Sequence, residues 1–177
     1  MPSGRIHDIV TLILTVPASI GAFIWFREAW PATVVGAAFL FGGMVFGPDL
    51  DTKSKQYSRW GIFRFLWMPY RMFFKHRSRF THGLLFGSLF RVIYFIGVVT
   101  LLMYVISLAW TGISDDSVPD IRNFARAWQM IAELANKYLG EDFLILSFVG
   151  LWLGAASHTF SDMAITYIKT GKVERMF

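Results

Sequence analysis

The chain has 177 residues, a length typical of one domain, with 55% hydrophobic residues, 16% charged residues and a formal charge of +5 at neutral pH. Soluble domains average about 25% charged residues, and the apolar residues here stand in long blocks, so the composition excludes an ordinary soluble domain and indicates a membrane protein. The absence of cysteine excludes disulfides and thiolate metal sites, which leaves nitrogen and oxygen as the metal ligands.

A short polar segment begins the chain, and two apolar runs follow it. Residues 9–26 are about long enough to cross a bilayer, and Pro17 is expected to weaken or kink this helix, which membrane bundles tolerate. A cleaved signal peptide is the alternative for this run, disfavoured by the weakly charged lead. Residues 31–47 are rich in glycine and alanine, which permit close helix packing in lipid, and the run ends at a Gly-Pro pair.

A basic segment follows, over residues 52–82, with eight lysines and arginines and no acidic residue. The Lys/Arg bias of short loops sets membrane orientation, so this segment is predicted to be cytoplasmic. Nucleic-acid binding is not expected of a basic patch that lies between spans. Aromatic residues are interspersed over residues 52–75, which predicts one or two short interfacial helices, broken near Pro69, with aromatics in the headgroup layer and bases at anionic lipid. A solvated basic loop with a few buried aromatics is the alternative.

The third apolar run, residues 83–110, contains one charge, Arg91. A lone arginine inside a membrane faces the bundle interior or reaches the interface. By the helical period Arg91 lies roughly half a turn round from His82, so we expect it to have a structural role outside the polar site described below.

An acidic segment and a last apolar run complete the chain. Residues 111–142 hold six acids against three bases and are predicted to be external. Within them an amphipathic helix is expected to start at Asp120 and to stop near Gly140, lying on the outer membrane surface. Residues 143–168 form the last span. The predicted fold is all-α, one membrane domain over residues 1–177 with about four transmembrane helices, short interfacial helices and both termini in the cytoplasm.

This topology brings four polar clusters to the inner side of the membrane. Two clusters flank the first two spans, one precedes the third, and the last lies within the fourth. At about 1.5 Å per residue, His158 and Asp162 are roughly 22 and 28 Å from the outer end of the fourth span, near the inner boundary of a core about 30 Å thick. The set includes all four histidines of the chain. Its members are His7 with Asp8, Asp49 with Asp51, His76 with His82, and His158 with Asp162.

A metal site is the chemistry that such a set favours. His158 and Asp162 are four residues apart and share one helix face. Histidine and aspartate without cysteine suit Zn²⁺ first, and Mn²⁺ or Fe²⁺ as alternatives. The candidates exceed the four ligands of one tetrahedral site, so one or two ions are expected, with part of the set orienting the rest. The candidate ligands are His7, Asp49, Asp51, His76, His82, His158 and Asp162. The structural alternative is that each histidine is a hydrogen-bonded packing residue at a membrane boundary.

Substrate and proton-transfer roles are assigned to neighbouring residues. Arg77 and Arg79 lie between two candidate ligands, and arginine binds phosphate in bidentate fashion. They would suit a phosphate-bearing or lipid substrate, or else they only extend the positive loop. Asp8 and Asp51 are the candidate general bases.

The chain resembles a bacterial family of uncharacterised membrane proteins described as metal-binding, and the wider group of inner-membrane proteins described as metal-dependent hydrolases. The resemblance rests on four motifs in order: SGRIHD at 3–8, FGPDLD at 46–51, HRSRFTHG at 76–83 and SHTFSD at 157–162. It implies metal binding through the seven candidate ligands and location in the plasma membrane, and it leaves catalysis open.

Two functions of different classes therefore stand. The first is an integral membrane metal-binding protein that acts as a metal-dependent hydrolase on a phosphoester or lipid at the cytoplasmic face. The alternative is a non-catalytic, metal-dependent membrane scaffold or metal-handling protein. A transporter is third, because apart from Arg91 the first three spans lack the midplane polar residues of a transport pathway.

Overall fold

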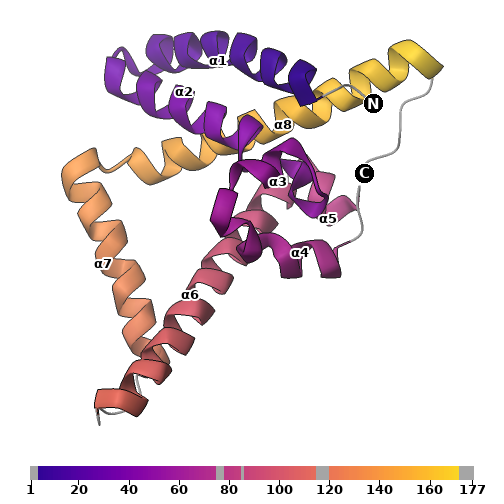
Figure 1. The fold of residues 1–177 in the computed structure, drawn as a ribbon. Helices are drawn as coiled ribbons and strands as arrows, with labels where there is room; N and C mark the ends of the chain where they lie inside the picture. Colours follow the sequence, from indigo (N-terminus) through magenta and orange to yellow (C-terminus); the bar gives the residue numbers. More distant parts are fainter. Residues whose placement is uncertain (1–3, 75–77, 85, 115–119, 172–177) are drawn as a thin grey trace.

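The computed structural model describes residues 4–74, 78–84, 86–114 and 120–171, and over these residues the chain is helical without a β-strand (Figure 1). Four helices are long and apolar enough to cross a membrane. They lie in α1 (Gly4–Phe26), in α2 (Ala29–Met44) together with the turns that continue it to Asp51, in α6 (Phe86–Ser114) and in α8 (Phe143–Thr170). The predicted all-α class with four candidate spans is confirmed, and a membrane location is compatible with it.

The first two helices differ from their predicted bounds at the polar ends. α1 already begins at Gly4, so the polar residues that precede the apolar run belong to the helix. Within this polar start, Asp8 is ion-paired with Lys55 and Arg59. Pro17 lies inside α1 without ending it. α2 ends at Met44, and a 3-10 turn, η1 (Pro48–Asp51), follows with proline in its first turn.

Helices α1 and α2 form a hairpin that lies along α8, whereas α6 diverges from this group (Figure 1). Glycine permits the close approach of α2 to α8. A Cβ atom on Gly42 would collide with the carbonyl oxygen of Leu151, and one on Gly154 would collide with that of Phe39. Small residues at such crossings let two backbones touch. The contact fixes the second half of α8 beside the end of α2.

Short helices fill the basic segment between α2 and α6. They are α3 (Lys55–Arg59), η2 (Gly61–Trp67), α4 (Met68–Phe73) and α5 (Arg79–His82). The break between η2 and α4 falls next to Pro69, as predicted, because proline suits the first turn of a helix. The alternative is therefore wrong in expecting an irregular loop, although the few buried aromatics that it expected are present.

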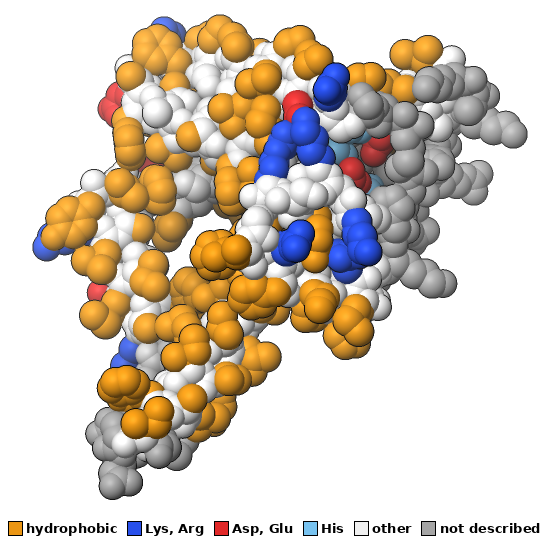
Figure 2. Space-filling view, in the orientation of Figure 1, with side chains coloured by type: hydrophobic (Ala, Val, Ile, Leu, Met, Phe, Trp, Pro, Cys, Tyr) orange, Lys and Arg blue, Asp and Glu red, His pale blue; other side chains and the backbone are white. Residues whose placement is uncertain are grey.

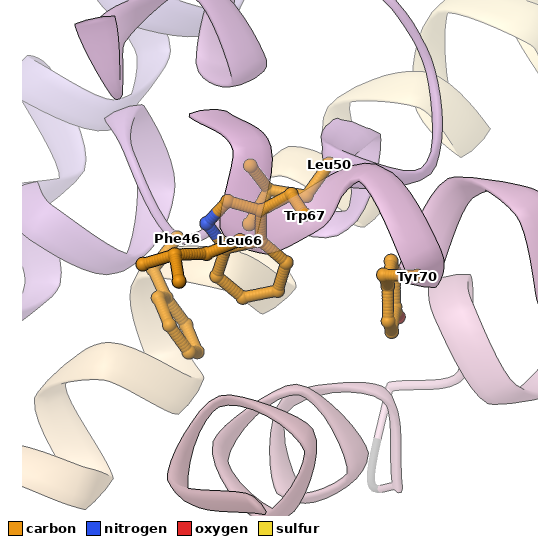
Figure 3. Close-up of a cluster of buried hydrophobic side chains, with 5 residues drawn as sticks. All are labelled: Phe46, Leu50, Leu66, Trp67 and Tyr70. Carbon is orange, nitrogen blue, oxygen red and sulfur yellow. The ribbon is translucent and has the colours of Figure 1, made fainter. Parts of the chain in front are cut away.

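The prediction that the aromatic residues of this segment lie in the headgroup layer is wrong for the buried ones and stays a prediction for the exposed ones. Phe63, Phe65 and Phe73 are half or more exposed, but Trp67 and Tyr70 are fully buried. The buried ones pack in a hydrophobic cluster of Phe46, Leu50, Leu66, Trp67 and Tyr70 (Figure 3). The sequence pattern missed this because helix breaks turn one side of each short helix toward α6. Burial raises the pKa of Tyr70 to about 12, so this phenol stays protonated at neutral pH.

Hydrogen bonds tie the hydrophobic cluster to α6. The Tyr94 hydroxyl donates to the Leu66 carbonyl at 2.7 Å and accepts from the Tyr70 amide at 3.0 Å. Leu50 is the one residue of η1 that enters the cluster, and Asp49 and Asp51 stand on either side of it. The cluster therefore anchors η1 and fixes the position of its two aspartates relative to α6.

Helix α7 (Ile121–Leu139) returns from the far end of α6 to the start of α8 (Figure 1). Its predicted start is confirmed, because the Asp120 side chain accepts from the Arg122 amide at 3.1 Å. Its predicted stop is confirmed as well, because Gly140 adopts a positive φ of 99° that favours glycine. Its place on the outer membrane surface stays a prediction. Hydrophobic side chains cover much of the outside of the long helices (Figure 2).

Candidate metal centre

The first half of the candidate centre joins α1 to α8. The imidazole rings of His7 and His158 stack with centroids 3.7 Å apart and planes inclined by 13°. His7 Nε2 lies 3.3 Å from Asp162 Oδ1, and His158 Nε2 lies 3.9 Å from Asp162 Oδ2. All three side chains are buried. The four-residue spacing of His158 and Asp162 does place both on one face of a helix, as predicted.

The second half adds η1 and α5. Asp49 Oδ2 lies 3.2 Å from His158 Nε2, and Asp49 Oδ1 lies 3.4 Å from His82 Nε2. His82 Nδ1 lies 3.6 Å from Asp51 Oδ2. Asp49 thus faces one histidine with each oxygen and connects the two halves. Six of the seven predicted ligands are brought together from four separate elements.

The donor set fits one or two divalent ions. Potential ligand atoms of His7, His158 and Asp162 lie within 4.8 Å of one another, and so do those of Asp49, His82 and Asp162. Asp162 belongs to both groups. His158 Nε2, Asp49 Oδ1 and Asp162 Oδ1 are buried and have no hydrogen-bond partner among the described residues. Buried polar atoms are normally partnered, and a cation at this point would satisfy all three. Nitrogen and carboxylate donors without sulfur suit Zn²⁺, Mn²⁺ or Fe²⁺.

Gln56, on α3, supports two of these ligands and was missed in the sequence. Its amide nitrogen donates to the Gly43 carbonyl at 2.8 Å and lies 3.1 Å from His158 Nδ1. Its amide oxygen accepts from the Asp49 backbone amide at 3.0 Å. The side chain is buried. One signal could have found it: Gln56 is the only asparagine or glutamine in residues 52–82.

Arg91 lies directly behind His82, contrary to its predicted separation from the site. Its guanidinium donates to the Thr81 carbonyl at 2.7 Å and to Ser88 Oγ at 2.9 Å, and Thr81 Oγ1 lies 3.0 Å from His82 Nδ1. The prediction was wrong because it continued one helix through His82 and Arg91. In the structure α5 ends at His82 and α6 begins at Phe86, so the helical period does not connect the two residues. The expected structural role remains.

The other predicted site residues do not all lie at the candidate centre. Asp51 is buried beside His82, whereas Asp8 is ion-paired with Lys55 and with Arg59 Nη2, the latter at 2.7 Å. His76 and Arg77 lie outside the described residues. Arg79 is the first residue of α5, and its side chain is outside the description too.

A cavity of about 440 Å³ opens onto the candidate centre. Three of the candidate ligands, His7, Asp49 and His158, form part of its wall. Lysine and arginine side chains gather over the short helices beside exposed parts of histidine and acidic residues (Figure 2). The other lining residues are Gly4, Arg5, Asp8, Gly43, Ser54, Lys55, Gln56 and Arg59. The arrangement leaves the buried ligands accessible to a small molecule from one side.

Replacing Gln56 with alanine is expected to weaken metal binding by about 10- to 100-fold, the usual cost of losing a residue that orients a metal ligand. The reason is that His158 and the backbone of Asp49 both lose the amide that holds them. Chelator competition on the detergent-purified protein measures the affinity. Ser58→Ala, an exposed change on the same helix, is the control. An unchanged affinity would show that Gln56 only fills space.

Comparison with known proteins agrees with this chemistry. The family model described as "Uncharacterized metal-binding protein (DUF2227)" matches residues 2–172. A protein of Aquifex aeolicus (strain VF5), described as an uncharacterized protein, is 38% identical over 60 residues, which are 33% of this chain and 42% of that relative. The match therefore spans less than half of the relative's length. No solved structure matches the chain.

Proposed function

Since this chain belongs to the uncharacterized metal-binding protein family, we propose that it is an integral membrane protein that hydrolyses a phosphoester at the cytoplasmic face with the help of one or two divalent ions. The observation that carries this proposal is the meeting of three histidines and three aspartates beneath an open cavity. Zn²⁺ is the first choice for the ion, with Mn²⁺ and Fe²⁺ as alternatives.

The residues that would hold metal are His7, His158 and Asp162 in one group, and Asp49 and His82 with Asp162 in the other. When bound, a divalent ion lowers the pKa of a coordinated water and polarises a phosphoryl oxygen. Asp49 and Asp162 each direct their two oxygens to different histidines. Carboxylates in such positions can serve both groups at once, which supports a two-ion site over a single one.

The residues around the ligands have positioning roles in this proposal. Gln56 fixes the ring of His158, and Asp51 beside Thr81 fixes the ring of His82. Of the two candidate general bases, Asp8 borders the cavity, but its carboxylate is engaged by Lys55 and Arg59. We therefore assign Asp8 to holding these cations at the cavity, and Asp51 to orienting His82.

A non-catalytic role as a metal-dependent scaffold is the second candidate, and one observation favours it. The ligands come from α1, η1, α5 and α8, so a bound ion would cross-link four elements of the fold. An ion that binds only the folded state stabilises it by mass action. In this alternative the site would hold the helices together and the cavity would admit only metal.

Metal removal separates the two functions. Elemental mass spectrometry of the detergent-purified protein is expected to find one or two equivalents of Zn, Mn or Fe, and release of phosphate from a panel of phosphoesters is expected to stop on chelation and return on metal addition. Bound metal without hydrolysis under any added ion, together with a large fall in melting temperature on chelation, would favour the scaffold. Absence of metal, even after reconstitution, would contradict both.

A further inference from the structure

We infer that Lys55 and Arg59 of α3, with Arg5 of α1, form a binding site for the phosphate group of the substrate at the rim of the cavity. The inference rests on the proposed function, because the same cavity leads to the metal ligands. It names the substrate class as a phosphate ester and the residues that recognise it.

The cavity connects the two sets of side chains. Arg5, Lys55 and Arg59 line it together with the candidate ligands His7 and Asp49. Its volume of about 440 Å³ lies within the range of roughly 300–1,000 Å³ that is usual for small-molecule sites. A phosphate group in the cavity can therefore touch the cations while its ester bond faces the metal ligands.

The charges of the rim favour an anion. Asp8 is the one carboxylate of the cavity wall that does not belong to the candidate ligand groups. It is paired with Lys55 and Arg59, and Arg5 adds a third cation to the wall, so the rim keeps two net positive charges. Arginine and lysine are the residues that recognise phosphate, arginine through its planar fork and lysine as a compact charge.

The cations are held in place before any ligand arrives. Arg59 Nη1 donates to the Met44 carbonyl at 2.7 Å, and Arg59 Nη2 donates to Asp8 at 2.7 Å. Lys55 pairs with the same oxygen, Asp8 Oδ2, and its side chain is 49% exposed, which leaves ammonium hydrogens for a further acceptor. The two cations are four residues apart on α3 and share one face. Asp8 thereby links the rim to His7, its neighbour on α1.

This assignment differs from the one suggested by the sequence. The motif between His76 and His82 gave the phosphate-binding role to Arg77 and Arg79. Arg77 and the side chain of Arg79 lie outside the described residues, so their role stays a prediction. The residues of α3 lack such a motif and are found only through their position above the ligands.

The test is titration of inorganic phosphate into the metal-loaded, detergent-purified protein, followed by calorimetry. Lys55→Gln and Arg59→Gln are each expected to weaken phosphate binding by about tenfold or more, the cost of one charge-assisted hydrogen bond. Metal content is expected to stay at the wild-type level. Arg64→Gln is the matched control, since it removes one charge from the same basic segment at an exposed position outside the cavity wall. Phosphate affinity equal to wild type in both α3 variants would overturn the inference.

Lys55→Gln carries the test if Arg59→Gln fails to fold, because Arg59 also bonds to Met44 and Lys55 is half exposed. Competition then identifies the source of the phosphate group. Displacement by phosphatidic acid in phosphatidylcholine nanodiscs assigns a lipid, and displacement by soluble glycerol phosphate assigns a water-soluble ester. Either result supports the phosphate site at the rim if Lys55→Gln weakens binding of the competitor by the same factor as it weakens binding of inorganic phosphate. Displacement that is equal in Lys55→Gln and in the wild type contradicts the site.

The two proposals fail in different ways. Phosphate binding that depends on Lys55 and Arg59, without hydrolysis by the wild type, contradicts the hydrolase and leaves the phosphate site. Hydrolysis at wild-type rate and wild-type KM in both variants contradicts the phosphate site and leaves the hydrolase.

Discussion

Replacing Asp162 with asparagine is expected to abolish stoichiometric metal binding, with an affinity loss well above the roughly 100-fold that marks the loss of a supporting residue. Asp162 is the residue that both candidate ligand groups share. Asparagine keeps the shape of the side chain but removes the negative charge and one anionic oxygen, so both groups lose a ligand at once. Elemental mass spectrometry and chelator competition measure the result.

Asp142→Asn is the matched control for this change. It makes the same substitution at the exposed start of α8, far along the helix from the candidate centre. It is expected to keep the wild-type metal content. Retention of two equivalents by Asp162→Asn would contradict the shared role of Asp162, whereas retention of one would place the carboxylate in a single group.

Replacing Gly154 with alanine is expected to give the largest loss of stability, at or above about 3 kcal/mol, the upper end for overpacking a tight contact. The added Cβ would meet the carbonyl oxygen of Phe39 directly, and would lie 2.8 Å from the Phe39 carbonyl carbon and 2.9 Å from the Gly43 amide nitrogen. These are backbone atoms, so α2 and α8 have to separate. Metal content is expected to fall as well, because His158 and Asp162 follow on the same helix. Thermal unfolding in detergent measures the first effect.

The comparison variant is Gly21→Ala in α1, where an added Cβ meets no other atom within 4 Å among the described residues. Alanine has a higher helix propensity than glycine by about 1 kcal/mol, so this variant is expected to melt at or above the wild-type temperature. If Gly154→Ala melts like Gly21→Ala, the close approach of α2 and α8 does not limit stability.

The four spans and the meeting of distant polar clusters could be predicted from the sequence. Long apolar blocks determine which segments can cross a bilayer, and the lysines and arginines of residues 52–82 determine which ends lie together. His7, Asp49 and His82 could be placed together because each stands at an end of its candidate span, and His158 could be added from its distance along the last one. No knowledge of side-chain packing is required to bring them near one another.

Other parts of the site could not be predicted, because they depend on where short helices break. Arg91 reaches Thr81 only because α5 and α6 are separate. Gln56 reaches His158 only because α3 packs against η1. Trp67 and Tyr70 are buried by α6, which the sequence places beyond the segment. Composition and periodicity predict each helix, but they do not predict how the turns orient one short helix relative to the next.

The candidate centre takes its ligands from α1, η1, α5 and α8, so the order in which the ribosome makes these elements determines when the centre can form. Ribosomes add roughly 5–20 residues per second, so His158 is synthesised roughly 8–30 s after His7. The α1–α2 hairpin can pack in that interval, but α8, which supplies Asp162 to both ligand groups, is the last of the described helices to be synthesised. A chain that stalls before α8 holds His7, Asp49 and His82 without the carboxylate that they share. Occupancy of the centre would therefore report that α8 has packed against the helices that precede it.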